Sequence, residues 1–120
     1  MAAVALNKFR TVRVGVTTNL VGIYTCPIGV ASIIILAQVT NIGIGSSASV
    51  HTVSAVHSRS STLDTGDYKF ANNFHVPPYD SATLIPDGRL ALETNDVLKI
   101  QGSANGVLEL VLSILETAKQ

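Results

Sequence analysis

The segment from Val107 to Glu116 has the pattern that most limits how this chain can fold. Every second position in it carries a large aliphatic residue: Leu108, Leu110, Leu112 and Ile114. A two-residue period places these side chains on one face of a strand, and the preceding Asn105-Gly106 is typical of a hairpin turn. A helix is the alternative, because Leu and Glu are good helix formers. The alternation favours the strand, and we expect its aliphatic face in the core beside Ile33 and Ile35.

The rest of the chain also lacks a convincing helical period. It contains 14 Val, 10 Ile and 11 Thr, so 35 of its 120 residues are β-branched and favour strands. The predicted strands span residues 9–17, 20–25, 30–40, 48–58, 82–85, 89–93, 97–102 and 107–116, with a further extended segment at 68–76. Strands at this spacing predict a single all-β domain over residues 1–120. We expect an antiparallel β-sandwich, jelly-roll-like, with about eight strands and frayed ends.

Charge is scarce and balanced. Charged residues make up 13% of the chain, about half the roughly 25% of ordinary soluble domains, and the formal net charge is zero. A nucleic-acid partner would need a basic surface. No apolar run approaches the roughly 20 residues of a membrane-spanning helix, the first ten residues do not resemble a secretory signal, and one cysteine excludes an internal disulfide framework. A neutral, weakly charged surface tends towards association, so we expect a subunit covered by neighbours.

The strand predicted at residues 30–40 carries aliphatic side chains on both faces. One face holds Ile33 and Ile35, and the other holds Ile34 and Leu36. One cover would be the core of the domain, and the other could be a neighbouring subunit. A central strand of an ordinary sandwich would show the same pattern.

No set of residues assembles a catalytic or metal site. His51 and His57 are about 20 Å apart along a straight strand, so they cannot share one metal ion, and His75 lies on another segment. Cys26 precedes a proline in an apolar turn and is better interpreted as a small buried residue than as a nucleophile. We therefore expect no metal, no cofactor and no enzymatic activity.

The segment from Arg59 to Tyr79 shows little regular pattern over about 21 residues. Long loops in compact domains are commonly functional. Aromatic residues and arginine dominate interface energetics, which makes five residues candidate subunit contacts: Arg59, Tyr68, Phe70, Phe74 and Tyr79. The alternative is a lid over the domain's own core, with Phe70 and Phe74 buried beneath it.

Short stretches from Tyr24 onwards resemble a known family. They are Ile23-Tyr24-Thr25-Cys26-Pro27-Ile28-Gly29, Val39-Thr40-Asn41, His75-Val76-Pro77-Pro78-Tyr79-Asp80-Ser81, Leu90-Ala91-Leu92-Glu93-Thr94-Asn95-Asp96 and Leu112-Ser113-Ile114-Leu115-Glu116. Together they look like an aliphatic strand with its entry and exit, a Pro-Pro corner, a hairpin and a final strand. This order is similar to small β-sandwich virion proteins of tailed phages, especially T-even-like phages of marine cyanobacteria.

That resemblance implies a non-enzymatic virion structural protein that decorates or cements the particle at the capsid surface, neck or tail. Its partners would be other virion proteins and copies of itself in a homo-oligomer, with no nucleic acid and no membrane. The alternative function is a glycan-binding host-attachment module on a fibre or baseplate. Few aromatic residues and no Trp weaken the glycan hypothesis.

Overall fold

The computed structural model describes residues 7–43, 49–60, 64–86 and 88–118. Within these ranges the chain forms nine strands and no helix long and apolar enough to cross a membrane. The strands are β1 (Asn7–Gly15), β2 (Val21–Thr25), β3 (Val30–Asn41), β4 (His51–Ser60), β5 (Thr65–Val76), β6 (Ser81–Thr83), β7 (Leu90–Leu92), β8 (Val97–Gly102) and β9 (Leu108–Ala118). The frayed ends expected from the sequence fall on residues outside the described ranges.

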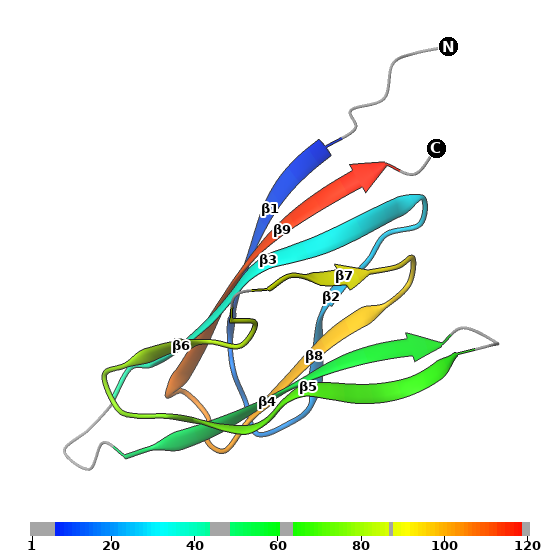
Figure 1. Cartoon of the computed structure of the whole chain (residues 1–120). Coiled ribbons are helices and arrows are strands. Elements are labelled where there is room, and N and C mark those ends of the chain that lie inside the picture. Colours follow the sequence, from blue (N-terminus) through cyan, green and yellow to red (C-terminus); the bar gives the residue numbers. More distant parts are fainter. Residues whose placement is uncertain (1–6, 44–48, 61–63, 87, 119–120) are drawn as a thin grey trace.

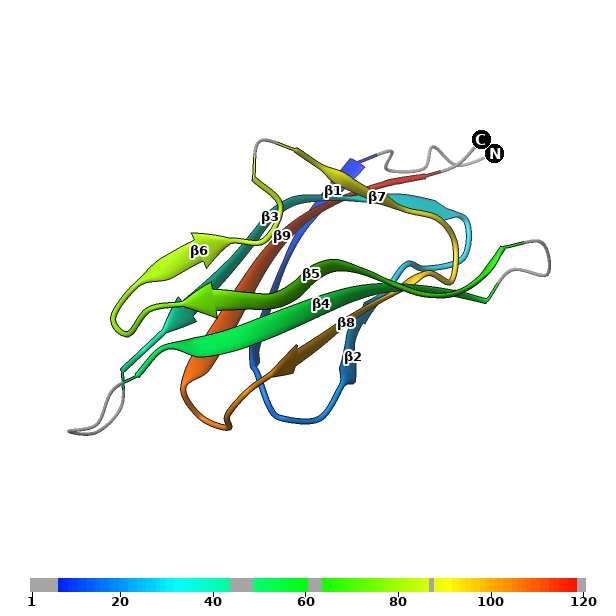
Figure 2. The same ribbon diagram turned by 60° about the horizontal axis from the view of Figure 1, so that its bottom comes forward.

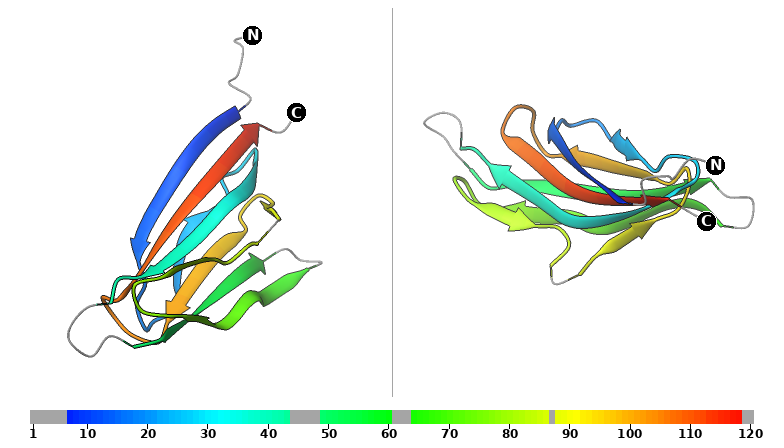
Figure 3. Two further views of the ribbon diagram at one scale, coloured as in Figure 1. Left: turned by 60° about the vertical axis from the view of Figure 1, so that its left-hand side comes forward. Right: turned by 90° about the horizontal axis from the view of Figure 1, so that it is seen from above.

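Two antiparallel sheets pack face to face as a sandwich, which confirms the predicted fold class (Figure 1). Sheet A has the order β1-β9-β3-β6, with β7 also paired to β3, and sheet B has the order β2-β8-β4-β5. Figure 3 shows the two layers from the side and from above. The strands follow jelly-roll order: the chain crosses between the layers at every connection except β4–β5 and β6–β7, and β6 and β7 together take one edge position. That split makes nine strands where about eight were expected.

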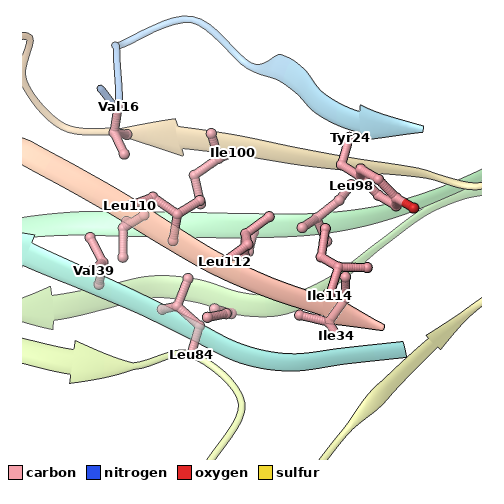
Figure 4. Packing of buried hydrophobic residues seen from close by; sticks show 14 of the residues in the cluster. Val16, Tyr24, Ile34, Val39, Leu84, Leu98, Ile100, Leu110, Leu112 and Ile114 are labelled. Carbon is pink, nitrogen blue, oxygen red and sulfur yellow. The ribbon is translucent and has the colours of Figure 1, made fainter. Parts of the chain in front are cut away.

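The core lies between the sheets, as Figure 4 shows. The aliphatic face of β9 is buried there as predicted: Leu108, Leu110, Leu112 and Ile114 are each at most 1% exposed. Residues of sheet B face them across the core, among them Tyr24, Leu98 and Ile100. Burial of each large aliphatic side chain contributes about 1.5–3 kcal/mol.

The expectation that Ile33 and Ile35 join this core is wrong. Ile34 is fully buried, while Ile35 is 38% exposed. The register of β3 with β9 shifts between Ile34 and Leu36, which is a β-bulge. A one-residue shift exchanges the two faces of a strand, so Ile34 points inward before the bulge and Ala37 after it. The same bulge separates the stretch of β3 paired with β7 from the stretch paired with β6.

The prediction that residues 59–79 show little regular structure is also wrong. β4 continues to Ser60 and β5 begins at Thr65, and the two strands pair antiparallel along their length (Figure 2). Most side chains of β5 are exposed because it is the edge strand of sheet B. A strand exposed on both faces has no apolar alternation, so its sequence resembles a loop.

Candidate contact surfaces and a buried ionic cluster

Arg59, the penultimate residue of β4, is held by three carboxylates on two other segments. Its Nε donates to Asp96 Oδ1 at 2.9 Å and its Nη2 donates to Asp96 Oδ2 at 2.7 Å, a bidentate pair. The guanidinium also lies 2.9 Å from Asp64 Oδ2 and 3.0 Å from Glu93 Oε2. This cluster joins the end of the β4–β5 hairpin to the turn between β7 and β8.

Asp96 is the centre of the cluster and is 1% exposed. Besides the guanidinium, its Oδ2 accepts from the Glu93 amide at 2.9 Å and lies 2.8 Å from His57 Nε2. Burial favours the neutral acid, but the hydrogen bonds from Arg59, His57 and the Glu93 amide outweigh it and hold the Asp96 pKa well below its usual range. An ionised carboxylate can only accept hydrogen bonds. The hydrogen bond between His57 and Asp96 therefore requires a proton on Nε2 of His57.

The hydrogen bonds that Arg59 donates to Asp96 and Asp64 raise the pKa of its guanidinium, and the bond to Asp96 is the largest cause. An open depression of about 480 Å³ lies beside the guanidinium. Its lining is polar: Arg59, Ser60, Asp64, Glu93, Thr94, Asn95 and Asp96. Across the described part of the chain, no three His, Cys, Asp or Glu side chains are grouped to hold a metal ion.

From the sequence, Asp96 was named only as the last residue of a stretch that resembles a hairpin, and it was given no role. Asp96 does sit in a tight turn, where Asn95 has a positive φ of 71°. Its ionic partner is 37 residues away in the sequence and meets it only because β4 pairs with β8. The hairpin pattern is visible in the sequence, but nothing near Asp96 in the sequence identifies Arg59 as its partner.

The five predicted contact residues follow one edge of the molecule and do not form a single patch. Tyr68 and Tyr79 are 72% and 73% exposed. Tyr68 pairs with His57 towards the Ser60–Thr65 end of the hairpin, whereas Tyr79 follows the opposite end, where its amide donates to the Asn41 carbonyl at 2.9 Å. Phe74 is partly exposed, Phe70 packs against the core, and Arg59 bonds its own carboxylates. Their role in assembly stays a prediction.

A second polar cluster lies inside the sandwich. The Tyr24 hydroxyl donates to the Glu116 carboxylate and lies 2.7 Å from Ser32 Oγ. Burial, followed by the bond to Glu116, raises the Tyr24 pKa. Cys26 is fully buried beside Ser32, with its Sγ 3.3 Å from Ser32 Oγ, in agreement with a small buried residue. His51 contacts Ser103 and His57 contacts Asp96, so these two histidines have separate partners.

Comparison with known proteins finds similarity of fold and none of sequence family. No protein-family model matches the chain, and no curated protein matches it in sequence. A chain from Bacillus endospore appendages, described as disulfide-linked pili, shares the fold at a TM-score of 0.55 and 12% identity, covering 100% of this chain and 98% of that one. A chain of the acid-stable capsid of Helicobacter pylori bacteriophage KHP30 matches at 0.50 and 12%, covering 97% and 90%. Both neighbours are components of pili or a capsid, and at this identity the likeness is one of fold.

Proposed function

We propose that this chain is a non-enzymatic structural subunit of a tailed-phage particle, which decorates or cements the capsid surface, neck or tail. The observation that carries the proposal is the exposure of large apolar side chains in separate parts of a chain with zero net charge. Four of them are at least 72% exposed: Phe9, Ile28, Tyr68 and Tyr79. They lie on β1, on the β2–β3 turn, on β5 and after β5. A subunit surrounded by neighbours buries such groups in several contacts at once.

The single buried cysteine supports a capsid-type role over a disulfide-linked pilus-type role. The pilus neighbour belongs to disulfide-linked pili, whereas Cys26, the one cysteine of this chain, is fully buried. The folded chain therefore offers no accessible thiol for such a link. The phage resemblance of the sequence motifs and the capsid neighbour point in the same direction.

The contacts of this subunit are proposed to use Arg59, Tyr68, Phe70, Phe74 and Tyr79, with the two exposed tyrosines contributing most. Mass spectrometry of purified particles from the phage or host that encodes the chain tests the function, because a structural subunit is present in many copies per particle. Tyr68→Ser and Tyr79→Ser should lower incorporation, and Leu20→Ser, at another exposed apolar position, is the matched control. A chain absent from purified particles contradicts the proposal.

One observation favours a second candidate function, glycan binding. A smaller depression of about 250 Å³ places the exposed Tyr68 beside His57, Arg59 and Asp64. An exposed ring next to hydrogen-bonding groups suits a sugar. Binding to a glycan array that is lost in Tyr68→Ala would support this function, and no binding by the folded chain would exclude it for the glycans tested.

A further inference from the structure

The outer face of sheet A, the side turned away from the core, carries a continuous apolar row. Strand register places Phe9 on β1 beside Leu115 on β9, Leu115 beside Ile33 on β3, and Ile33 beside Ala91 on β7. These positions alternate with the buried ones on every strand, so all four point outward. Four neighbouring strands therefore present one apolar band to the solvent.

The band widens along the strands. The bulge of β3 leaves both Ile35 and Leu36 exposed, at 38% and 36%, and Val111 on β9 is 38% exposed. Beside the bulge, an open depression of about 400 Å³ is lined by Ile35, Leu36 and Ile85 together with Thr83, Gly88 and Arg89. Phe9, at 73% exposure, projects from the opposite edge of the same face. The face thus carries both an aromatic projection and a hollow with apolar and polar walls.

The outward positions that are paired in sheet A include two charged residues, Arg13 on β1 and Glu109 on β9. Neither forms an ion pair with another described residue. These strands therefore offer one cation and one anion, and Arg89 adds a second cation at the depression. When two copies of the face meet, Arg13 of each copy is complementary to Glu109 of the other.

We infer that the outer face of sheet A binds the same face of a second copy of this chain. The inference rests on the proposed function as a self-associating structural subunit and names its contact surface. A face that meets its own copy forms an isologous contact, which closes at two chains. The pair of opposite charges, the aromatic projection and the hollow make this face self-complementary, as that symmetry requires. Packed sheets lie about 10 Å apart, so the outward side chains of two copies fill the space between them.

Sedimentation equilibrium of the full chain over micromolar to millimolar concentration tests the inference. We expect a monomer–dimer equilibrium. Leu115→Lys puts an unpaired charge in the middle of the apolar row and should raise the dimer dissociation constant at least about tenfold. Val97→Lys is the matched control, because Val97 is an apolar residue of a paired strand on the outer face of sheet B. It should leave the dissociation constant unchanged.

Two further sets of variants keep the test independent of folding. Phe9→Ser changes an exposed edge residue and should weaken the dimer with an unchanged circular dichroism spectrum and thermal midpoint. Arg13→Glu replaces the pair of opposite charges with two carboxylates and should weaken the dimer more at low salt than at high salt. The double variant Arg13→Glu/Glu109→Arg restores the pair of opposite charges and should recover most of the affinity.

A chain that stays monomeric at all concentrations overturns the inference, as does a dimer weakened equally by Val97→Lys and Leu115→Lys. A monomer that is nevertheless abundant in purified particles would leave the proposed function standing and assign this face to another virion protein. A dimer with the expected variant pattern, made by a chain absent from particles, would support the face and contradict the proposed function.

Discussion

Two carboxylates are buried at one end of the sandwich. The main partner of one is a cation, and the main partner of the other is a neutral hydroxyl. Asp96 is bonded by a guanidinium, an imidazole and a backbone amide. Glu116 accepts from the phenol of Tyr24, and its nearest cation, the Arg10 guanidinium, is 3.5 Å away. Cys26 lies between them: its amide donates to the Asp96 carbonyl, and its thiol contacts Ser32, which also contacts Tyr24.

The difference between the two clusters follows from what each one joins. Asp96 links surface segments, the hairpin end and the β7–β8 turn, so a charged partner can remain partly in water while bonding it. Glu116 links sheet A to Tyr24 of sheet B across the interior. There a neutral phenol can be desolvated at less cost than a cation. We therefore expect an acid-sensitive surface link and an alkali-sensitive interior link.

The largest expected effect comes from removing the charged link. Asp96→Ala leaves the Arg59 guanidinium, the His57 ring nitrogen and the Glu93 amide without their shared acceptor. Breaking a buried ion pair by deleting one partner costs about 3–5 kcal/mol. Arg59 keeps Asp64 and Glu93, so we expect about 3 kcal/mol, at the lower end of that range. Urea unfolding at pH 7 measures it, and Asp80→Asn, at an exposed turn, is the control. A loss equal to that of the control would show that the cluster does not stabilise the fold.

Acid should remove the same link in the unmodified chain. The folded-state pKa of Asp96 is depressed below its unfolded value. Its contribution to stability is therefore present above the unfolded Asp pKa of about 3.9 and is lost as the pH falls towards the folded pKa. We expect the free energy of unfolding to decline below about pH 4 and to decline less steeply in Asp96→Ala. If the free energy of unfolding declines equally in the two proteins as the pH falls, Asp96 is not the cause of the acid sensitivity.

The sequence identified the strands whose two faces differ and missed the features that depend on pairing. The face of β9 was predicted because its alternation is strict. The inward residue of β3 was missed because Ile33, Ile34, Ile35 and Leu36 are all aliphatic, so nothing in the sequence marks where the bulge lies. β5 was expected only in part, as an extended segment at 68–76, because its exposed side chains have no clear apolar period. The Arg59–Asp96 and Tyr24–Glu116 pairs join residues 37 and 92 positions apart, so the topology determines them.

The interior link should be weaker than the surface link, because it has no full charge pair. Tyr24→Phe removes the hydroxyl that bonds Glu116 and contacts Ser32, while the ring still fills its site. Leaving a buried acceptor without its donor costs about 1–3 kcal/mol, and we expect about 1–2 kcal/mol because Arg10 remains near Glu116. Tyr68→Phe removes a hydroxyl from an exposed ring and should leave stability unchanged. A loss above that of Asp96→Ala would reverse the proposed ranking of the two clusters.

The smallest expected effect is the alkaline sensitivity of the same pair. The folded-state pKa of Tyr24 is raised above its unfolded value by burial and by the bond to Glu116. Its contribution is therefore complete below the unfolded Tyr pKa of about 10 and is lost as the pH rises through the folded pKa. At a pH of about 10.5 the loss should stay below about 1 kcal/mol, because linkage amounts to about 1.4 kcal/mol per pH unit above the unfolded pKa. Urea unfolding between pH 9 and a pH of about 10.5 measures this loss, with Tyr24→Phe as the reference that lacks the titrating group. Lysine deprotonation affects both proteins alike, so their difference isolates Tyr24. If the difference between the two proteins does not change over this range, the hydroxyl of Tyr24 titrates equally in the folded and unfolded chains, and the interior link is not sensitive to alkali.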